Sequence, residues 1–355
     1  ANLLEQHSEE LAGLITAETG KTISDARVEL VRAINTTVAS GEEARQISGE
    51  ALDSDAYAPT RGRLGVVCWR PLGTVLCITP FNFPINIAMH KIGPAFAAGN
   101  AIMFKPGPLN TGSARLLVQL CHQAGIPEEV LQLCIPDVGD MSALIADPRI
   151  AAVNFTGGTA AADAIAAAAG YKKLLLELGG NDPLIVMPDG DVQAAVQAAI
   201  NQRFATAGQR CTAAKRLYIH DAIYDEFRDA LVTASSRLKT GDPTEEDTFV
   251  GPVIHAAAAD EIERRIADAV GKGATVALGG VRDGNIIHPT ILENAADDCE
   301  LMTQETFGPV MPLRRFQELD EIIPLINDSP FGLQAGVFTQ NLSVARRLFE
   351  ELEVG

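Results

Sequence analysis

The sequence predicts an α/β protein of two domains, the first built on a doubly wound parallel sheet and the second a further α/β domain. The chain has 355 residues, of which 47% are hydrophobic and 21% charged, and this balance supports two globular cores and excludes disorder. From residue 73 onward, apolar runs of strand length alternate with longer runs of helical periodicity. This alternation requires crossover connections, which produce parallel strands with helices packed on the sheet faces.

The first seventy residues precede this alternation. Leu3, Leu11 and Ile15 repeat at helical spacing on one face, Gly20 ends that run, and Val28, Leu30, Val31 and Ile34 form a second periodic run. Residues 49–71 alternate polar with apolar side chains and predict a β-hairpin that forms an exposed arm. We therefore expect a first domain over residues 1–179, with the arm at about 50–71, and a second domain over 180–355.

Each domain contains several predicted strands and helices. In the first domain, strands are expected at 74–79, 101–105, 131–135 and 150–155, and helices at 84–98, 111–124, 141–146 and 159–169. In the second, strands are expected at 184–187, 216–219, 275–277 and 336–339, and helices at 192–204, 224–238, 257–270, 319–326 and 342–352.

The loops after the first-domain strands indicate a ligand site, because such sheets bind ligands beyond the carboxyl ends of their strands. These loops are Thr79-Pro80-Phe81-Asn82-Phe83-Pro84, Lys105-Pro106-Gly107 and Phe155-Thr156-Gly157-Gly158-Thr159. The last of them opens a helix with two glycines, which suits a phosphate. Together they outline a dinucleotide site, although the fingerprint G-x-G-x-x-G is absent and a lone lysine is more often a solvated surface residue.

One cysteine and one carboxylate stand out in the chain. Cys211 follows Gly208-Gln209-Arg210, and we expect the Arg210 cation to lower the thiol pKa. Glu177 ends an apolar run and is expected at the buried end of a strand. A thiol and a carboxyl that meet in a fold divide covalent chemistry at a carbonyl carbon between them. The alternatives are an inert buried thiol and an ordinary solvated carboxylate.

Charge and cysteine usage exclude other classes. The net charge of −18 disfavours nucleic acid and anionic membrane surfaces as partners. The six cysteines include no C-x-x-C pair and the histidines no H-x-x-x-H pair, so no metal site is expected. Scattered cysteines without a secretory signal favour the cytoplasm. Because the sequence begins at Ala1, earlier removal of a signal peptide stays open.

Six motifs occur in an order that resembles the aldehyde dehydrogenase superfamily: Pro80-Phe81-Asn82-Phe83-Pro84, Lys105-Pro106, Phe155-Thr156-Gly157-Gly158, Glu177-Leu178-Gly179-Gly180, Gly208-Gln209-Arg210-Cys211 and Glu305-Thr306-Phe307-Gly308-Pro309. The resemblance implies a Rossmann-like cofactor domain, an α/β catalytic domain that carries the cysteine, and a hairpin arm that pairs subunits into a homodimer or homotetramer. It implies oxidation of an aldehyde to a carboxylic acid with NAD or NADP. Members normally extend further at both ends, so residues 180–355 are expected to be a catalytic domain incomplete at its C-terminal end.

The resemblance also implies roles for individual residues. Cys211 matches the nucleophile, Asn82 matches a donor to the oxyanion, Glu177 matches the base that activates water, and Lys91 matches a lysine near the catalytic centre. The residues that match the cofactor site are Thr79, Phe81, Lys105, Gly157, Gly158, Leu178, Glu305 and Phe307. Pro108 stands where NAD-preferring relatives often have a glutamate that bonds the adenosine ribose, which leaves NADP as plausible as NAD.

Substrate choice is expected to depend on Arg210 and Thr212, which flank the cysteine. A guanidinium at this position suits a carboxylate, phosphate or phosphonate on a short aldehyde. The motif resembles the branches for semialdehydes, phosphonoacetaldehyde and non-phosphorylating oxidation of glyceraldehyde 3-phosphate. A structural salt bridge of Arg210 is the alternative. Two other functions also stay open for the chain, a coenzyme A-acylating aldehyde dehydrogenase and a noncatalytic protein of the same fold.

Overall fold

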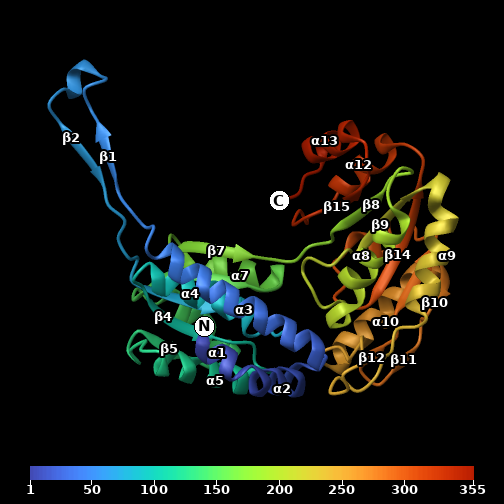
Figure 1. The fold of residues 1–355 in the computed structure, drawn as a ribbon, viewed down its shortest axis with the longest axis horizontal. Helices are drawn as coiled ribbons and strands as arrows, with labels where there is room; N and C mark the ends of the chain where they lie inside the picture. Colours follow the sequence, from blue (N-terminus) through green and yellow to red (C-terminus); the bar gives the residue numbers. More distant parts are fainter. The chain divides into compact units, whose positions relative to one another are not determined.

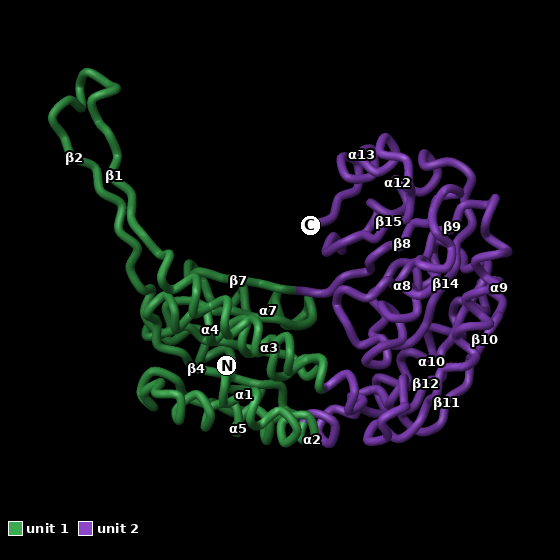
Figure 2. The backbone as a smooth tube through the Cα atoms, viewed as in Figure 1, with its two compact units in different colours: residues 1–14, 27–177 green, residues 15–26, 178–355 purple.

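The computed structural model describes all 355 residues, which form two compact units (Figures 1 and 2). The first unit comprises residues 1–14 and 27–177, and the second comprises residues 15–26 and 178–355. Helices α2 (Ser8–Thr19) and α3 (Ile23–Glu43) therefore each contribute residues to both units. The short segment 15–26, which the sequence places among first-domain residues, groups with the second unit.

The first unit is built on a five-stranded parallel sheet. Its strands are β3 (Thr74–Ile78), β4 (Ala101–Lys105), β5 (Leu131–Leu133), β6 (Ile150–Thr156) and β7 (Lys173–Glu177), in the spatial order β5-β4-β3-β6-β7. Every neighbouring pair is parallel, which confirms the predicted doubly wound sheet. The central strand β3 is apolar along its length and buried from its second residue on, as expected where helices cover both faces.

The helices of this unit are α1 (Asn2–Gln6), α4 (Asn86–Ala97), α5 (Thr111–Gln123), α6 (Met141–Ala146) and α7 (Thr159–Ala169), together with most of α2 and α3. Four of the five agree with the predicted ranges to within two residues. In α3 the buried stripe passes through Ala26, Leu30 and Ala33, whereas Val28 and Val31 are exposed. Residues 26, 30 and 33 share one helical face, and residues 28 and 31 fall outside it.

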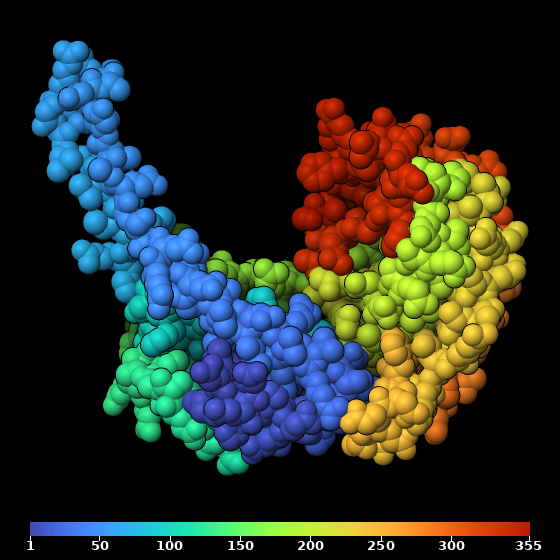
Figure 3. All heavy atoms as spheres, viewed as in Figure 1, coloured from blue at the N-terminus to red at the C-terminus, as the bar shows by residue number.

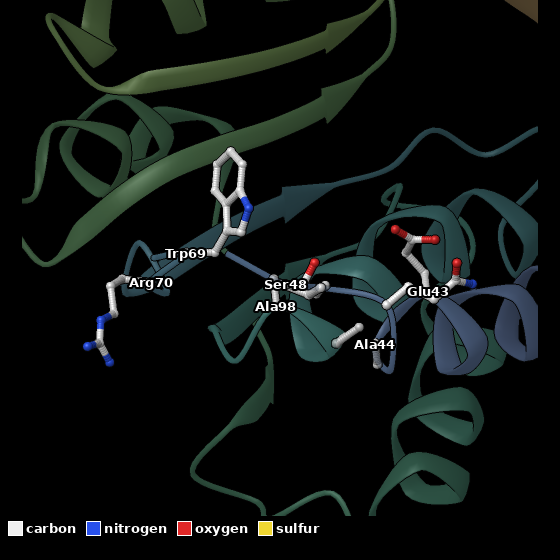
Figure 4. Close-up of a pocket in the computed structure, with 9 residues that line it drawn as sticks. Glu43, Ala44, Ser48, Trp69, Arg70 and Ala98 are labelled. Carbon is white, nitrogen blue, oxygen red and sulfur yellow. The ribbon is translucent and has the colours of Figure 1, made fainter. Parts of the chain in front are cut away.

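The predicted hairpin is confirmed. Strands β1 (Glu50–Asp53) and β2 (Leu64–Val67) pair antiparallel and project from the first unit as an arm (Figures 1 and 3). Leu64 is 81% exposed and Trp69, just beyond β2, is 71% exposed. A pocket of about 600 Å³ at the base of the arm is lined by residues that include Ser48, Trp69, Arg70 and Ala98 (Figure 4). None of the predicted site residues lines it.

The second unit contains a six-stranded mixed sheet in the order β10-β13-β14-β9-β8-β15. Its strands are β8 (Pro183–Val186), β9 (Arg216–His220), β10 (Thr275–Leu278), β13 (Thr290–Glu293), β14 (Val310–Phe316) and β15 (Gly336–Phe338). Only the edge strand β10 runs antiparallel to its neighbour. A separate two-stranded ribbon joins β11 (Arg282–Asp283) to β12 (Ile286–Ile287). The sequence did not predict β13 and β14, although β14 lies inside the sheet.

Six helices pack around this sheet: α8 (Val192–Phe204), α9 (Tyr224–Ser235), α10 (Ala256–Gly271), α11 (Glu300–Thr303), α12 (Leu319–Asn327) and α13 (Leu342–Glu351). Their apolar faces and the sheet strands form one continuous core. No helix in the chain combines the length and apolar character that crossing a membrane requires. All six cysteines carry free thiols.

Candidate active site

The predicted loops of the first unit meet at one edge of its sheet. The main-chain N–H of Thr79, after β3, donates to the carbonyl oxygen of Lys105 at the end of β4, over 3.1 Å. The N–H of Gly157, after β6, donates to the carbonyl oxygen of Glu177 at the end of β7, also over 3.1 Å. The structure therefore gathers the carboxyl ends of four neighbouring strands, where parallel sheets bind their ligands.

Asn82 is buried in the turn between β3 and α4. The carboxylate of Glu29, a buried residue of α3, fixes the end of this turn. Its Oε1 accepts the main-chain N–H groups of Ile85, over 2.8 Å, and Asn86, over 3.0 Å. Such charge-assisted bonds to helix N-terminal amides both satisfy the amides and hold the entering chain. The segment that presents Asn82 is thus rigidly held within its own unit.

Lys91 on α4 is a buried cation of the same unit. Its Nζ donates to Asn154 Oδ1 over 2.6 Å. Burial lowers the pKa of Lys91 to about 8, while the Cys77 thiol group and the Glu177 carboxylate oppose that change. Glu177 itself is exposed, so the expectation of a buried carboxyl is wrong. The reason is the sheet order, because β7 is an edge strand and only its other side is covered by β6.

The amino end of α7 is open to a phosphate group. Gly158 is its N-cap, and no side chain caps the first turn, whose main-chain amides form the positive end of the helix dipole. Lys105 lies half-buried at the end of β4, and burial lowers its pKa. Thr79 is buried and Phe81 half-buried in the neighbouring loop. These features fit a dinucleotide whose phosphates and adenosine lie along this edge.

In the second unit Cys211 stands four residues before Lys215, just ahead of β9. Burial raises the pKa of the Cys211 thiol, and both the Lys215 ammonium and a hydrogen bond from the Thr212 main chain oppose this rise. The structure thus identifies Lys215 as a cation that favours the thiolate, and the role expected for Arg210 stays a prediction. Thr212 is half-buried, and its carbonyl oxygen accepts the Gln334 Nε2–H over 2.8 Å.

Lys215 joins the cysteine to Glu305. The lysine is 1% exposed, and its Nζ donates to the Cys211 carbonyl oxygen over 2.5 Å and to Glu305 Oε1 over 3.0 Å. The main-chain N–H of Gly180 also donates to Glu305 Oε1, over 3.1 Å. Leu178 is half-buried, and Gly179 follows it. A Cβ atom at position 179 would collide with Glu305 Oε2, so the absence of a side chain there leaves room for the carboxylate. The Glu305 carboxylate is therefore held in place beside the cysteine segment.

The loop that carries Glu305 and the half-buried Phe307 is anchored by two arginines. Arg203, a buried residue of α8, donates from Nη2 to the Thr306 carbonyl oxygen over 3.0 Å, and Arg265 of α10 donates from Nη1 to the Glu305 carbonyl oxygen over 2.5 Å. Both bonds fix main-chain atoms, so the side chains of Glu305 and Phe307 are presented from a rigid loop.

Arg210 lies beside an acidic residue of its own unit. Its Nη2 is 4.0 Å from Asp25 Oδ1 and 3.5 Å from Thr206 Oγ1. Asp25 Oδ2 in turn accepts the Thr206 main-chain N–H over 2.6 Å and the Thr206 hydroxyl over 3.2 Å. The sequence left a structural salt bridge open as an alternative role for Arg210, and the long ion pair with Asp25 is consistent with that alternative.

Sequence reasoning missed Lys215, Asp25 and the buried Asp182. Burial raises the pKa of Asp182 to about 7, against the opposing field of Lys215. One signal was present in the sequence, because Lys215 and Arg216 stand together at the start of an apolar strand and buried cations require partners. The structure contains no group of three or more His, Cys, Asp or Glu side chains that could hold a metal ion.

The chain belongs to the aldehyde dehydrogenase family. The model of that family matches residues 1–355, the whole chain. Its members are NAD(P)-dependent oxidoreductases that act on aldehydes, and the same class holds for this chain.

Three relatives show where the chain lies within the family. It is 66% identical to the sulfoacetaldehyde dehydrogenase of Neptuniibacter caesariensis over 355 residues, which cover 100% of this chain and 78% of that protein. It is 38% identical to the 3-sulfolactaldehyde dehydrogenase of Priestia aryabhattai, over 100% of this chain and 75% of that one. The solved NADP-dependent glyceraldehyde-3-phosphate dehydrogenase of Bacillus halodurans C-125, complexed with NADP, superposes with a TM-score of 0.96 at 35% identity, over 100% of this chain and 75% of that one.

Proposed function

We propose that this protein oxidises a short aldehyde with a terminal sulfonate to the corresponding carboxylic acid, with NAD or NADP as the hydride acceptor. The observation that carries the proposal is the 66% identity, over the whole chain, to a protein named for its action on sulfoacetaldehyde. A relative named for 3-sulfolactaldehyde supports the same substrate class. A sulfonate is a compact anion, and it belongs with the carboxylate, phosphate and phosphonate groups that a guanidinium beside the nucleophile suits.

Cys211 is the proposed nucleophile. Its thiolate sulfur attacks the aldehyde carbon, a C–S bond forms, and the carbonyl electron pair moves onto oxygen to give a tetrahedral thiohemiacetal anion. The Lys215 ammonium and the Thr212 main-chain hydrogen bond favour the thiolate against the burial that disfavours it. The anion then expels hydride, and the carbon becomes a thioester attached to Cys211.

Asn82 and Glu177 are proposed to complete the reaction. The Asn82 amide donates to the oxyanion, a kind of preorganised stabilisation worth about 3 kcal/mol for each donor. Glu177 accepts a proton from water as the water oxygen attacks the thioester carbon, and the C–S bond then breaks to release the acid and the Cys211 thiolate. Its exposed position on an edge strand gives Glu177 access to that water.

The first unit is proposed to bind the dinucleotide and the second to carry the covalent chemistry. The open amino end of α7 fits the phosphates, and Lys105, at the end of β4, fits a ribose hydroxyl as a donor. The Glu305 carboxylate, already held by Lys215 and Gly180, fits the nicotinamide ribose. When bound, the nicotinamide ring accepts the hydride. The residues support both dinucleotides, since Pro108 places no carboxylate near a 2′-phosphate.

Arg210 is proposed to bind the substrate sulfonate. Its side chain is 20% exposed and directly precedes the proposed nucleophile in the sequence, and a planar guanidinium suits a bidentate contact to an anion. In a chain with a net charge of −18, a local cation of this kind selects strongly for an anionic substrate against neutral ones.

The test is a panel of sulfoacetaldehyde, phosphonoacetaldehyde, succinate semialdehyde and propionaldehyde, assayed at 340 nm with NAD⁺ and NADP⁺ separately. The proposal expects the highest kcat/KM for sulfoacetaldehyde. Arg210→Leu is expected to raise KM for the three anionic aldehydes more than for propionaldehyde. Equal changes for charged and neutral aldehydes would remove Arg210 from the substrate site.

Two results would replace the proposal as a whole. If turnover requires coenzyme A and yields an acyl-coenzyme A product, the protein is an acylating aldehyde dehydrogenase. If no aldehyde reduces either dinucleotide and Cys211 stays unmodified after iodoacetamide, it is a noncatalytic member of the family. Reduction of a dinucleotide with release of the free sulfonated acid supports the proposal and contradicts both.

A further inference from the structure

The chain before Cys211 contains three successive residues in the left-handed region of backbone conformation. Thr206 has φ of 55°, Ala207 has 51° and Gly208 has 71°. Only the glycine adopts this region without cost, and a β-branched threonine is strongly disfavoured there. A conformation of this kind persists only where the surrounding structure enforces it.

The principal contact is the carboxylate of Asp25, which lies 181 residues away in the sequence. Asp25 Oδ2 accepts both the main-chain N–H and the side-chain hydroxyl of Thr206, over 2.6 and 3.2 Å. Asp25 is itself fixed in the first turn of α3, where its N–H lies 3.4 Å from the Thr22 hydroxyl. The preceding segment is anchored on the same unit through a bond from the Ile23 N–H to the Pro243 carbonyl oxygen, over 2.8 Å.

The strained turn leads directly to the cysteine. The N–H of Gln209 donates to the Thr206 carbonyl oxygen over 3.0 Å, and the N–H of Arg210 donates to the Gly208 carbonyl oxygen over 2.9 Å. On its far side the turn packs so closely on Gly308 that a Cβ atom on Gly208 would collide with the Gly308 main chain. The path of residues 206–210 thus fixes where the Cys211 main chain and thiol lie relative to Lys215.

We propose that Asp25 is a positioning residue of the reaction: it holds Thr206 in its left-handed conformation and thereby sets Cys211 for attack. The inference rests on the proposed role of Cys211 as nucleophile. Asp25 touches no reacting atom in this account. It acts through Thr206, and its loss would let the turn relax and move Cys211 away from the Lys215 ammonium.

The test combines Asp25→Ala with a second substitution, Thr206→Gly. Asp25→Ala is expected to lower kcat/KM by about 10- to 100-fold, the range that follows a displacement of about 1 Å at a reacting atom. It is also expected to slow the alkylation of Cys211 by iodoacetamide, followed by peptide mapping below the unfolding temperature. Because glycine adopts positive φ without cost, Asp25→Ala with Thr206→Gly should recover a large part of both losses.

A matched control is Asp189→Ala. Asp189 also accepts one hydroxyl, from Thr339, and one main-chain N–H, from Gln340, in the same unit. It follows β8 at the carboxyl edge of the sheet, whereas Cys211 precedes β9 at the opposite edge. Its loss removes comparable bonds and is expected to leave the Cys211 alkylation rate within about twofold of the parent.

Three outcomes decide the inference. Slower alkylation in Asp25→Ala with recovery in the double variant supports it. Alkylation of Asp25→Ala at the rate of Asp189→Ala overturns it, and so does a double variant no faster than Asp25→Ala. If Asp25→Ala does not fold, Asp25→Asn replaces it, and the same comparison with and without Thr206→Gly applies. The alkylation measurement needs no turnover, so it decides this inference even if no aldehyde proves to be a substrate.

Discussion

Replacing Lys215 with methionine tests how the cysteine and the Glu305 carboxylate are held together. The substitution keeps the side-chain length and removes a charge that lies 3.0 Å from Glu305 Oε1 and 2.5 Å from the Cys211 carbonyl oxygen. At an effective dielectric constant of about 20, two charges 3.0 Å apart attract by about 5 to 6 kcal/mol before desolvation is counted. Lys215 is 1% exposed and Glu305 18%, so solvent does little to replace the lost partner.

The expected cost of Lys215→Met is about 3 to 5 kcal/mol in the free energy of unfolding, since it leaves a mostly buried carboxylate unpaired. The measurement is urea denaturation followed by circular dichroism. The matched control is Lys239→Met, because Lys239 also pairs with two carboxylates, those of Glu245 and Asp247, but at the surface. Surface pairs of this kind contribute about 0 to 1 kcal/mol, so the control should lose little.

The same variant has a second, chemical readout. Lys215 lowers the pKa of the Cys211 thiol against the effect of burial, so its removal should raise that pKa further and move the pH profile of iodoacetamide alkylation upward. KM for the dinucleotide should rise as well, because the Glu305 carboxylate loses its strongest anchor. An unfolding free energy equal to that of the Lys239 variant, together with an unshifted alkylation profile, would refute the reasoning.

Three further outcomes are expected. Burial raises the pKa of Asp182 to about 7, so the protonated carboxyl favours the folded state. Its contribution to the free energy of unfolding is complete below about pH 4 and is lost as the pH rises to about 7. Asp182→Asn should therefore flatten the dependence of the unfolding free energy on pH over that window. Val66→Asp on the exposed arm should lower the oligomer mass measured by light scattering, and an unchanged mass would show that the arm is not an interface. Pro108→Glu should raise KM for NADP⁺ more than for NAD⁺ in the 340 nm assay, by charge repulsion of the 2′-phosphate.

Most of the first unit could be predicted from its sequence because each element carries its own local signal. Strands such as Thr74–Ile78 are apolar from their second residue on, and glycines or prolines mark where they end. The loops that follow them were recognised as a ligand edge for the same reason, since in a parallel sheet the order of strands along the chain already places successive carboxyl ends together. The register of β3 with β4 and β6 confirms this placement.

Strand β14 shows where local signals fail. Its sequence Val310–Phe316 contains Pro312 and two arginines, features that argue against an interior strand. The structure accommodates them through partners distant in sequence: Arg314 pairs with Asp297, and Arg315 lies over the Tyr224 ring at 4.0 Å and pairs with acidic residues of the neighbouring segment. The proline stands opposite Leu292 within a parallel pairing that still forms on both sides.

The motif residues of the candidate site could be read from the sequence, but the residues that hold them could not. Cys211 and Glu305 stand in recognisable local patterns, whereas Asp25 and Lys215 acquire their meaning only from contacts with residues 181 and 90 positions away. Spacing carries no information about such pairs. The free-energy cost of a residue does carry information. A buried lysine and a threonine in the left-handed region are both unfavourable in isolation, so each requires a specific partner that offsets this free energy. Both partners lie in the second unit beside the cysteine, which is why the unfavourable residues mark the site as clearly as the motif does.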